Sequence, residues 1–88
     1  MVSLPSSDTP LYSHPLPLLE QWLCQLGAVA VPGRPEDWTL EQAAWSASIR
    51  FEREDLRVAW DHRGVRRVRQ FPYGLSRADV EAAILAGP

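Results

Sequence analysis

The sequence predicts an α+β fold, a two-layer sandwich in which an antiparallel meander of three to four strands is flanked by an N-terminal and a C-terminal helix. Three observations predict it. Apolar residues recur at helical spacing over residues 15–26, alternate residues are apolar from Trp45 onward, and a helix-start signature follows Gly74. Helices packed on the apolar sheet face would bury all three apolar surfaces and leave the other face open to solvent.

The chain of 88 residues suits one domain, which we place at residues 15–88. Residues 1–14 hold Pro, Ser, Thr and Asp and are expected to form an irregular N-terminal arm. Two prolines then fall in the first turn of the first helix, where N–H groups have no intrahelical partner. Gly27 suits a left-handed C-cap. The apolar stripe of this helix is Leu19, Trp22, Leu23 and Leu26.

Residues 28–44 carry the weakest pattern. Residues 28–31 are apolar and suit a short extended segment, whereas the Pro and Gly of residues 32–37 predict a loop. A first strand could begin at Trp38, but residues 40–44 suit a helical turn equally well. Both alternatives stay open.

A period of two residues defines the central strands. One runs from Trp45 to Phe51 and the next from Leu56 to Trp60, each with alternate apolar side chains. The turn after them is a hairpin in which Gly64 can adopt positive φ.

The last strand begins at Val65 and ends at Phe71, and its alternation is imperfect. Val65 and Phe71 share one parity, while Val68 has the other. A β-bulge near Arg66 and Arg67 would reconcile them.

The C-terminal helix has a complete start signal. Ser76 is a good N-cap, Asp79 stands three residues later, and Leu75 and Val80 can form a hydrophobic staple. Gly87 and the final proline end the helix. Its buried stripe is Val80, Ala83 and Ile84.

Composition limits the classes of partner and compartment. The net charge of −2 gives no overall basic field for nucleic acid or membrane binding. No apolar run approaches the length of a membrane span, and residues 1–8 lack the basic and apolar regions of a signal peptide, so we expect no secretory signal. The one cysteine, Cys24, cannot form an internal disulfide, so we expect a reducing, cytoplasmic setting.

The sequence contains no recognisable motif for catalysis or for metal binding. His14, Cys24 and His62 lack the spacing of zinc ligands, and adjacent Asp61 and His62 would point to opposite faces of a strand. No phosphate-binding loop or nucleophile motif is present. We therefore predict a non-enzyme with no cofactor and no metal.

All nine basic residues are arginines, and four of them, Arg63, Arg66, Arg67 and Arg69, crowd the last strand and its turn. The candidate partner-binding residues are Arg57, Arg63, Arg66, Arg67, Arg69 and Trp38. Trp38 lies beside the proline-rich loop and is expected to be partly exposed, whereas Trp22, Trp45 and Trp60 are expected in the core. The alternative is that the arginines pair with acids of neighbouring strands, namely Glu52, Glu54, Asp55 and Asp61.

The leading hypothesis is a non-enzymatic protein-interaction module, an adaptor or assembly factor that binds another protein through the open sheet face and its Arg-rich strand. One alternative is RNA or ribosome association, because α-β-β-β-α is also the order of double-stranded RNA-binding domains. However, the second helix starts with one base, Arg77, and one acid. Small-anion binding is the other alternative, and an edge strand could pair two copies as a homodimer. We expect no membrane partner.

Three segments resemble a family of small cyanobacterial and plastid proteins catalogued as a domain of unknown function. They are DTPLYSHPLP (8–17), LEQWL (19–23) and YGLSRADVEAAILAGP (73–88). The resemblance implies a cyanobacterial cytosolic protein and supplies no activity, cofactor or catalytic residue. It also favours an ordered arm, with Leu11 and Tyr12 packed over the sheet edge or the second helix.

Overall fold

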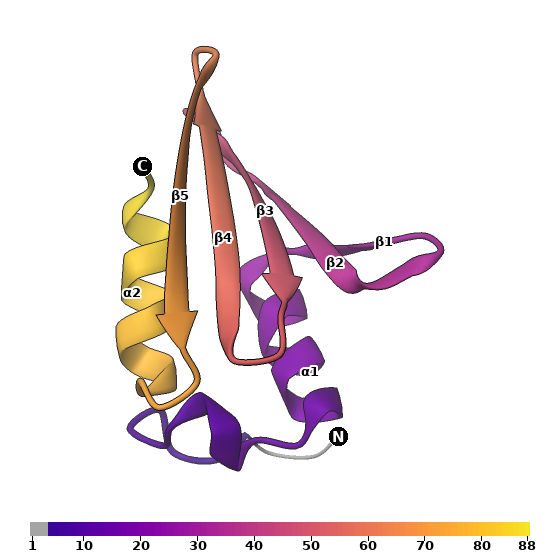
Figure 1. Cartoon of the computed structure of the whole chain (residues 1–88), viewed down its shortest axis with the longest axis vertical. Helices are drawn as coiled ribbons and strands as arrows, with labels where there is room; N and C mark the ends of the chain where they lie inside the picture. The colour runs from indigo at the N-terminus through magenta and orange to yellow at the C-terminus, as the bar shows by residue number, and fades with distance from the viewer. Residues whose placement is uncertain (1–3) are drawn as a thin grey trace.

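The computed structural model describes residues 4–88, which form one sheet and two α-helices (Figure 1). A 3₁₀ turn, η1 (Leu11–Ser13), precedes the helix α1 (Leu16–Leu26), and the helix α2 (Arg77–Ala86) ends the fold. The strands between the helices are β1 (Val29–Val31), β2 (Arg34–Glu41), β3 (Ser46–Phe51), β4 (Asp55–His62) and β5 (Val65–Pro72).

The sheet is an open antiparallel meander in the order β1-β2-β3-β4-β5. The predicted α+β class and meander are confirmed, but the sheet has five strands where we expected three to four. The additional strand comes from residues 28–44, where the loop predicted at residues 32–37 is wrong because β2 begins at Arg34. There β1 and β2 fold back on one another at Gly33 (φ 77°), and β2 continues to Glu41 in place of a helical turn.

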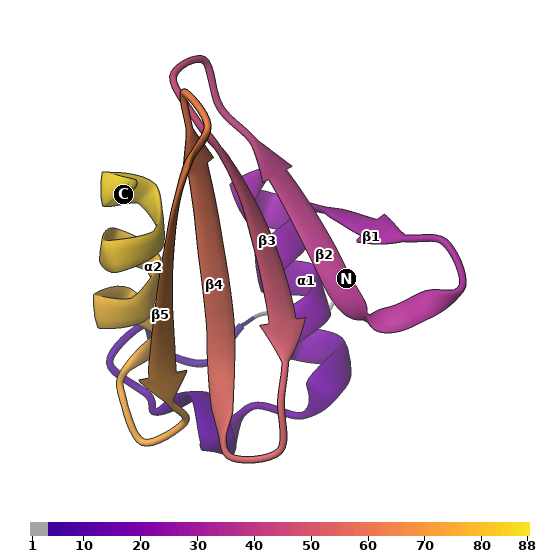
Figure 2. The same cartoon turned by 45° about the horizontal axis from the view of Figure 1, so that its top comes forward.

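Both helices contribute to one core against one face of the sheet. In Figures 1 and 2, α1 passes behind β2 and β3, and α2 lies beside β5. Trp22 of α1 donates a hydrogen bond from Nε1 to Oε1 of Glu81 in α2, at 2.8 Å. Trp60 of β4 donates from Nε1 to the carbonyl oxygen of Ile84, at 3.2 Å. The two helices are thereby bonded to each other and to the sheet.

The tryptophans differ from expectation in two places. Trp22 and Trp60 are fully buried, as predicted. Trp45 precedes β3 and is only half-buried. Trp38, which we expected to be partly exposed, is 6% exposed and belongs to the core. The reason is the register of β2, in which Trp38 is the partner of buried Ile49 and so shares the helix-covered face.

The predicted β-bulge near Arg66 and Arg67 is wrong. The pairing of β4 with β5 runs without interruption from His62 and Val65 to Asp55 and Pro72. The imperfect alternation has another cause: every residue of β5 from Val65 through Gln70 is exposed, so neither face of this segment must be apolar.

The local signals around the helices are confirmed. Gly27 caps α1 in the left-handed conformation (φ 100°), and the Ser76 hydroxyl accepts a hydrogen bond from the Asp79 backbone N–H at 3.2 Å. The arm before α1 is also packed: the Leu11 N–H donates to the carbonyl of Leu75. Leu11 is buried as expected, whereas Tyr12 is 71% exposed and does not cover the fold.

Candidate partner-binding surface

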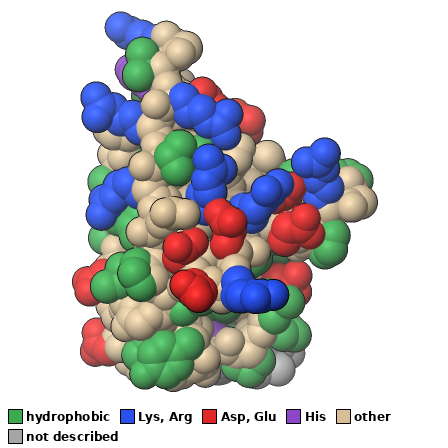
Figure 3. Space-filling model, viewed as in Figure 1, with side chains coloured by type: hydrophobic (Ala, Val, Ile, Leu, Met, Phe, Trp, Pro, Cys, Tyr) green, Lys and Arg blue, Asp and Glu red, His purple; other side chains and the backbone are tan. Residues whose placement is uncertain are grey.

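The five candidate arginines all lie on the hairpin of β4 and β5 and its turn. We call this set the arginine hairpin: Arg57, Arg63, Arg66, Arg67 and Arg69. Figure 3 shows several basic side chains around the hairpin end of the molecule, with a few acidic side chains beside them and a group of acidic side chains further down the sheet. The chain has five arginines and no acidic residue between Asp61 and Asp79, so the local charge is strongly positive although the net charge is −2.

The register divides the arginine hairpin between the two faces of the sheet. Arg67 is the partner of Trp60, so Arg67 and Arg69 lie on the face that carries the core. Arg66 and Arg57 lie on the open face. The sequence had suggested a single patch on the open face; the geometry instead presents guanidinium groups on both sides of one strand.

Arg63 occupies the tip of the hairpin. It has a positive φ of 52°, and Gly64 follows with φ 79°, which is the conformation of a tight two-residue hairpin turn. The turn matches the right-handed twist of the flanking strands, so the tip is a defined element. The Arg63 side chain is exposed there.

Ion pairing is concentrated away from β5. Arg50 bonds Asp37 twice, with Nε at 2.6 Å from Oδ1 and Nη2 at 3.0 Å from Oδ2, and Arg34 lies 3.6 Å from the same carboxylate. Arg57 lies 3.9 Å from Glu52, at the limit of an ion pair. Within residues 4–88, the other members of the arginine hairpin form no ion pair.

Arg50 and Asp37 on the open face largely neutralise each other's charge. The hydrogen bond from Arg50 lowers the pKa of the Asp37 carboxyl below its usual value, and Asp37 in turn raises the pKa of Arg50. Most of the charge of Arg50 is therefore balanced within the protein, in contrast to Arg66 on the same face.

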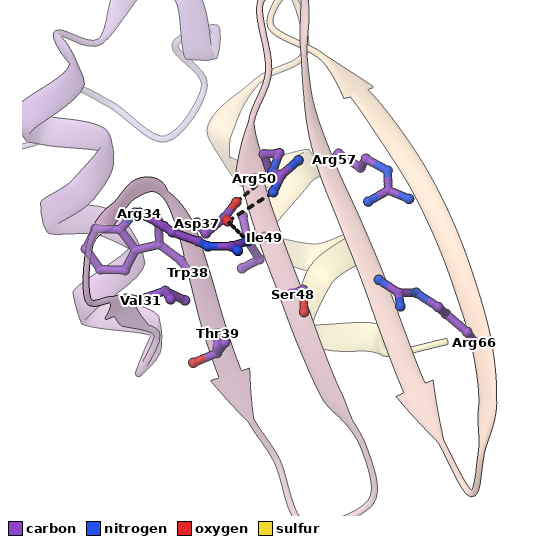
Figure 4. A pocket seen from close by; sticks show the side chains of 10 residues that line it. All are labelled: Val31, Arg34, Asp37, Trp38, Thr39, Ser48, Ile49, Arg50, Arg57 and Arg66. Atoms are coloured by element: carbon purple, nitrogen blue, oxygen red, sulfur yellow. Dashed lines mark hydrogen bonds and ion pairs between the residues drawn. The ribbon is translucent and has the colours of Figure 1, made fainter.

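A concavity of about 310 Å³ opens on this face. Figure 4 shows its lining side chains, among which Arg57 and Arg66 reach toward one another from neighbouring strands. The hydroxyl-bearing side chains of Thr39 and Ser48 also line it. Two guanidinium groups and two hydroxyls offer hydrogen-bond donors to a carboxylate or a phosphate.

On the other face, Arg69 stacks on the core. Its Cζ lies 4.8 Å from the centroid of the Phe71 ring. That ring meets Trp60 edge to face, with centroids 6.4 Å apart and planes at 85°. A cation at this distance over an aromatic ring is attracted to the ring face, and the exposed guanidinium keeps N–H groups available to a partner.

Comparison with known proteins supplies a family and no activity. A family described as "Protein of unknown function (DUF3143)" matches residues 26–87. The chain belongs to this DUF3143 family. No curated protein and no solved structure matches the chain. The match confirms the resemblance to a domain of unknown function and covers all strands and α2, whereas the segments at 8–17 and 19–23 lie before it.

In this DUF3143 chain, one ring nitrogen of each histidine lies by a backbone carbonyl, while the buried Nε2 of His14 has no hydrogen-bond partner in the described chain. His62 Nδ1 lies by the carbonyl oxygen of Ala44. His14 is buried, and its Nδ1 donates to the carbonyl of Pro10 at 3.0 Å. In the described part of the chain, no three His, Cys, Asp or Glu residues are grouped to hold a metal ion. No helix among residues 4–88 is long and apolar enough to cross a membrane.

Sequence reasoning missed the Arg34–Asp37–Arg50 group. Asp37 and Arg50 are opposite one another in the β2–β3 register, but that register became visible only once β2 was placed. Of the predicted site residues, the structure brings the arginine hairpin together and removes Trp38, because Trp38 is buried on the far face of β2.

Proposed function

We propose that this DUF3143 chain is a non-enzymatic interaction module, an adaptor or assembly factor, that binds an acidic segment of another protein through the arginine hairpin. One observation carries the proposal: Arg63, Arg66, Arg67 and Arg69 are exposed on one hairpin, and none has an ion-pair partner among the described residues. Their charge is therefore available to a partner.

The chemistry of the hairpin supports a protein partner. Arginine is enriched in protein interfaces because its planar fork binds carboxylates in pairs of hydrogen bonds. Val65 and Val68 stand between the arginines and are 58% and 43% exposed, so apolar contact is available next to each charge. Asp61 lies opposite Arg66 on the hairpin, but Glu52, Glu54 and Asp55 lie at the other end of β4, so the excess of arginine would orient an acidic partner toward the hairpin.

Affinity purification from the native host tests the proposal, with and without nuclease. The bait is the full chain, compared with an Arg66→Glu/Arg67→Glu variant and with Arg53→Glu as the matched control. Arg53 is exposed in the turn between β3 and β4 and has no ion-pair partner in the described chain. We expect a stoichiometric protein with wild type and the control, lost with the double variant. Failure to recover any stoichiometric protein with folded bait contradicts the proposal.

The nuclease arm addresses RNA or ribosome association. A partner lost on nuclease treatment, with binding to structured RNA that weakens steeply with salt, would favour that alternative. The structure offers it little support at α2, because Arg77 Nη2 donates to the carbonyl of Pro5 at 2.8 Å and is occupied within the protein.

Small-anion binding is the second candidate function, because Arg57 and Arg66 converge on the open-face concavity. It predicts a rise in Tm with millimolar phosphate or a dicarboxylate, abolished by Arg66→Ala. An unchanged Tm across such a panel removes it. A cytoplasmic setting and a cyanobacterial source remain predictions.

A further inference from the structure

We infer that the partner's acidic segment binds as a sixth strand along the free edge of β5. The inference rests on the proposed function and specifies its geometry. The segment would be extended and would carry the pattern complementary to Val65–Gln70, with an apolar residue opposite each valine and an acid opposite each arginine. Because β5 carries arginines on both faces, an added strand is the arrangement that reaches all of them at once.

In the pairing of β4 with β5, three residues of β5 have backbone N–H and C=O groups that point away from β4. His62 and Val65 close the two-residue turn, so they form a hydrogen-bonded pair, and such pairs alternate along an antiparallel ladder. Arg66, Val68 and Gln70 therefore fall in the non-bonded pairs, and their N–H and C=O groups point away from β4. No hydrogen bond from another part of residues 4–88 reaches these groups.

The edge is also physically open. β5 ends the strand order, and α2 packs by Val80 and Ile84 into the core. The residues that follow α2, Gly87 and Pro88, line a concavity next to Val68 but pair with no backbone group of β5 in the described chain. Figure 2 shows the hairpin end of β5 projecting beyond α2. The next residue in the outward series, Pro72, has no N–H, as is typical of an edge strand. Strand addition is therefore confined to the segment that carries the arginines.

A second copy of the chain fits this edge poorly. If two β5 strands paired antiparallel with Val68 opposite Val68, Arg67 would lie opposite Arg69. In the neighbouring registers that keep the outward-facing residues opposite one another, Arg67 would lie opposite Arg67 or Arg69 would lie opposite Arg69. Like charges directly opposite one another destabilise a strand pair. An acidic strand reverses the sign of each of these contacts, so charge complementarity selects it over self-pairing.

A peptide tests the inference directly. The probe is fluorescein-labelled Thr-Glu-Val-Glu-Glu-Val-Thr, whose valines and glutamates match β5 in antiparallel register; the control replaces each glutamate with lysine. Binding to the full chain is measured by fluorescence anisotropy. We expect saturable binding of the acidic peptide only, weakened at least tenfold by Arg67→Glu. No binding of the acidic peptide at millimolar concentration overturns strand addition. The proposed function is tested separately, by the affinity purification described above.

Val68→Pro separates strand addition from charge attraction. Proline removes the outward N–H of residue 68 and leaves every arginine in place, and Val68→Ala is the control that keeps the N–H. We expect Val68→Pro to weaken peptide binding at least tenfold and Val68→Ala less than threefold. Equal affinities of these two variants, with loss in Arg67→Glu, would overturn strand addition and leave the charge-based function standing.

Hydrogen exchange of the wild-type chain gives a readout without any variant. In the free chain, the amides of Arg66, Val68 and Gln70 should exchange faster than those of Arg67 and Arg69. Saturating peptide should slow the first set at least tenfold. Unchanged exchange of the first set overturns the inference, as does protection without peptide in a chain that sediments as a dimer.

Discussion

The bond between the two helices makes a quantitative prediction about stability. Trp22 is fully buried, and its Nε1–H has Glu81 Oε1 as its acceptor at 2.8 Å. The change Glu81→Ala removes that acceptor and leaves a buried donor unpaired, which costs about 1–3 kcal/mol of unfolding free energy. We expect the lower half of this range, because Glu81 is only half-buried and water can approach the vacated position.

In a domain of this size, each kcal/mol lowers Tm by roughly 4–8 °C, so the expected fall is roughly 4–16 °C. The assay is urea and thermal unfolding followed by circular dichroism, which avoids the direct effect of Glu81 on Trp22 fluorescence. Glu20→Ala is the matched control, since Glu20 lies on α1 and makes no hydrogen bond or ion pair in the described chain. It should change the unfolding free energy by less than about 0.5 kcal/mol.

A double-mutant cycle with Trp22→Phe isolates the bond from the packing of the ring. Phe has no donor, so Glu81→Ala should be nearly neutral in the Trp22→Phe background, and the coupling free energy should be about 1 kcal/mol. Equal urea midpoints for Glu81→Ala and Glu20→Ala in the wild-type background would refute the reasoning, because the bond would then contribute nothing to the helix layer.

Three further changes test other parts of the structure. Trp38→Ala should lower the unfolding free energy by about 3–5 kcal/mol, because Trp38 is 6% exposed; an unchanged urea midpoint would mean that it is a surface residue. The lowered pKa of Asp37 means that its bond to Arg50 contributes stability above the unfolded pKa of about 3.9, lost as pH falls through the lower folded pKa. The stability difference between wild type and Asp37→Asn should therefore shrink from pH 6 to pH 2, and a constant difference would contradict the assignment. Gly64→Ala should cost about 1–2 kcal/mol because φ is 79°, whereas Gly74→Ala, with open space and no positive φ, should be nearly neutral; equal effects would argue against the hairpin turn.

The parts of the fold that the sequence predicts are those fixed by neighbours in the chain. The stripe of α1, its cap at Gly27 and the Ser76 cap of α2 are local signals, and each is found where its spacing predicts. The alternation of β3 and β4 is equally local, because both strands are covered on one face along their length. Local rules suffice there because burial follows the period of the backbone.

The parts that could not be predicted depend on pairing between distant residues. β2 has only Trp38 and Leu40 buried among its eight residues, too few for a period to emerge. Whether Trp38 is a core or a surface residue depends on which face of β2 meets α1, and that follows from its pairing with β3. The candidate site shows the same division: its arginines were visible in the sequence, but their distribution over two faces is set by the β4–β5 register.

The exposed edge of β5 imposes two requirements that arginine meets together. An open edge with two exposed valines would invite pairing between copies, and charge along the edge opposes it. Charge alone could be supplied by either sign, and balanced charges would suffice for solubility. The only charged residues of the hairpin from residue 63 to residue 69 are arginines, and they form no ion pair in the described chain, whereas Asp37 pairs with Arg50 and Arg34. This single sign of charge has an effect beyond preventing self-association. It keeps the edge available to a strand of the opposite charge, so the protection of the monomer and the selection of a partner follow from the same side chains.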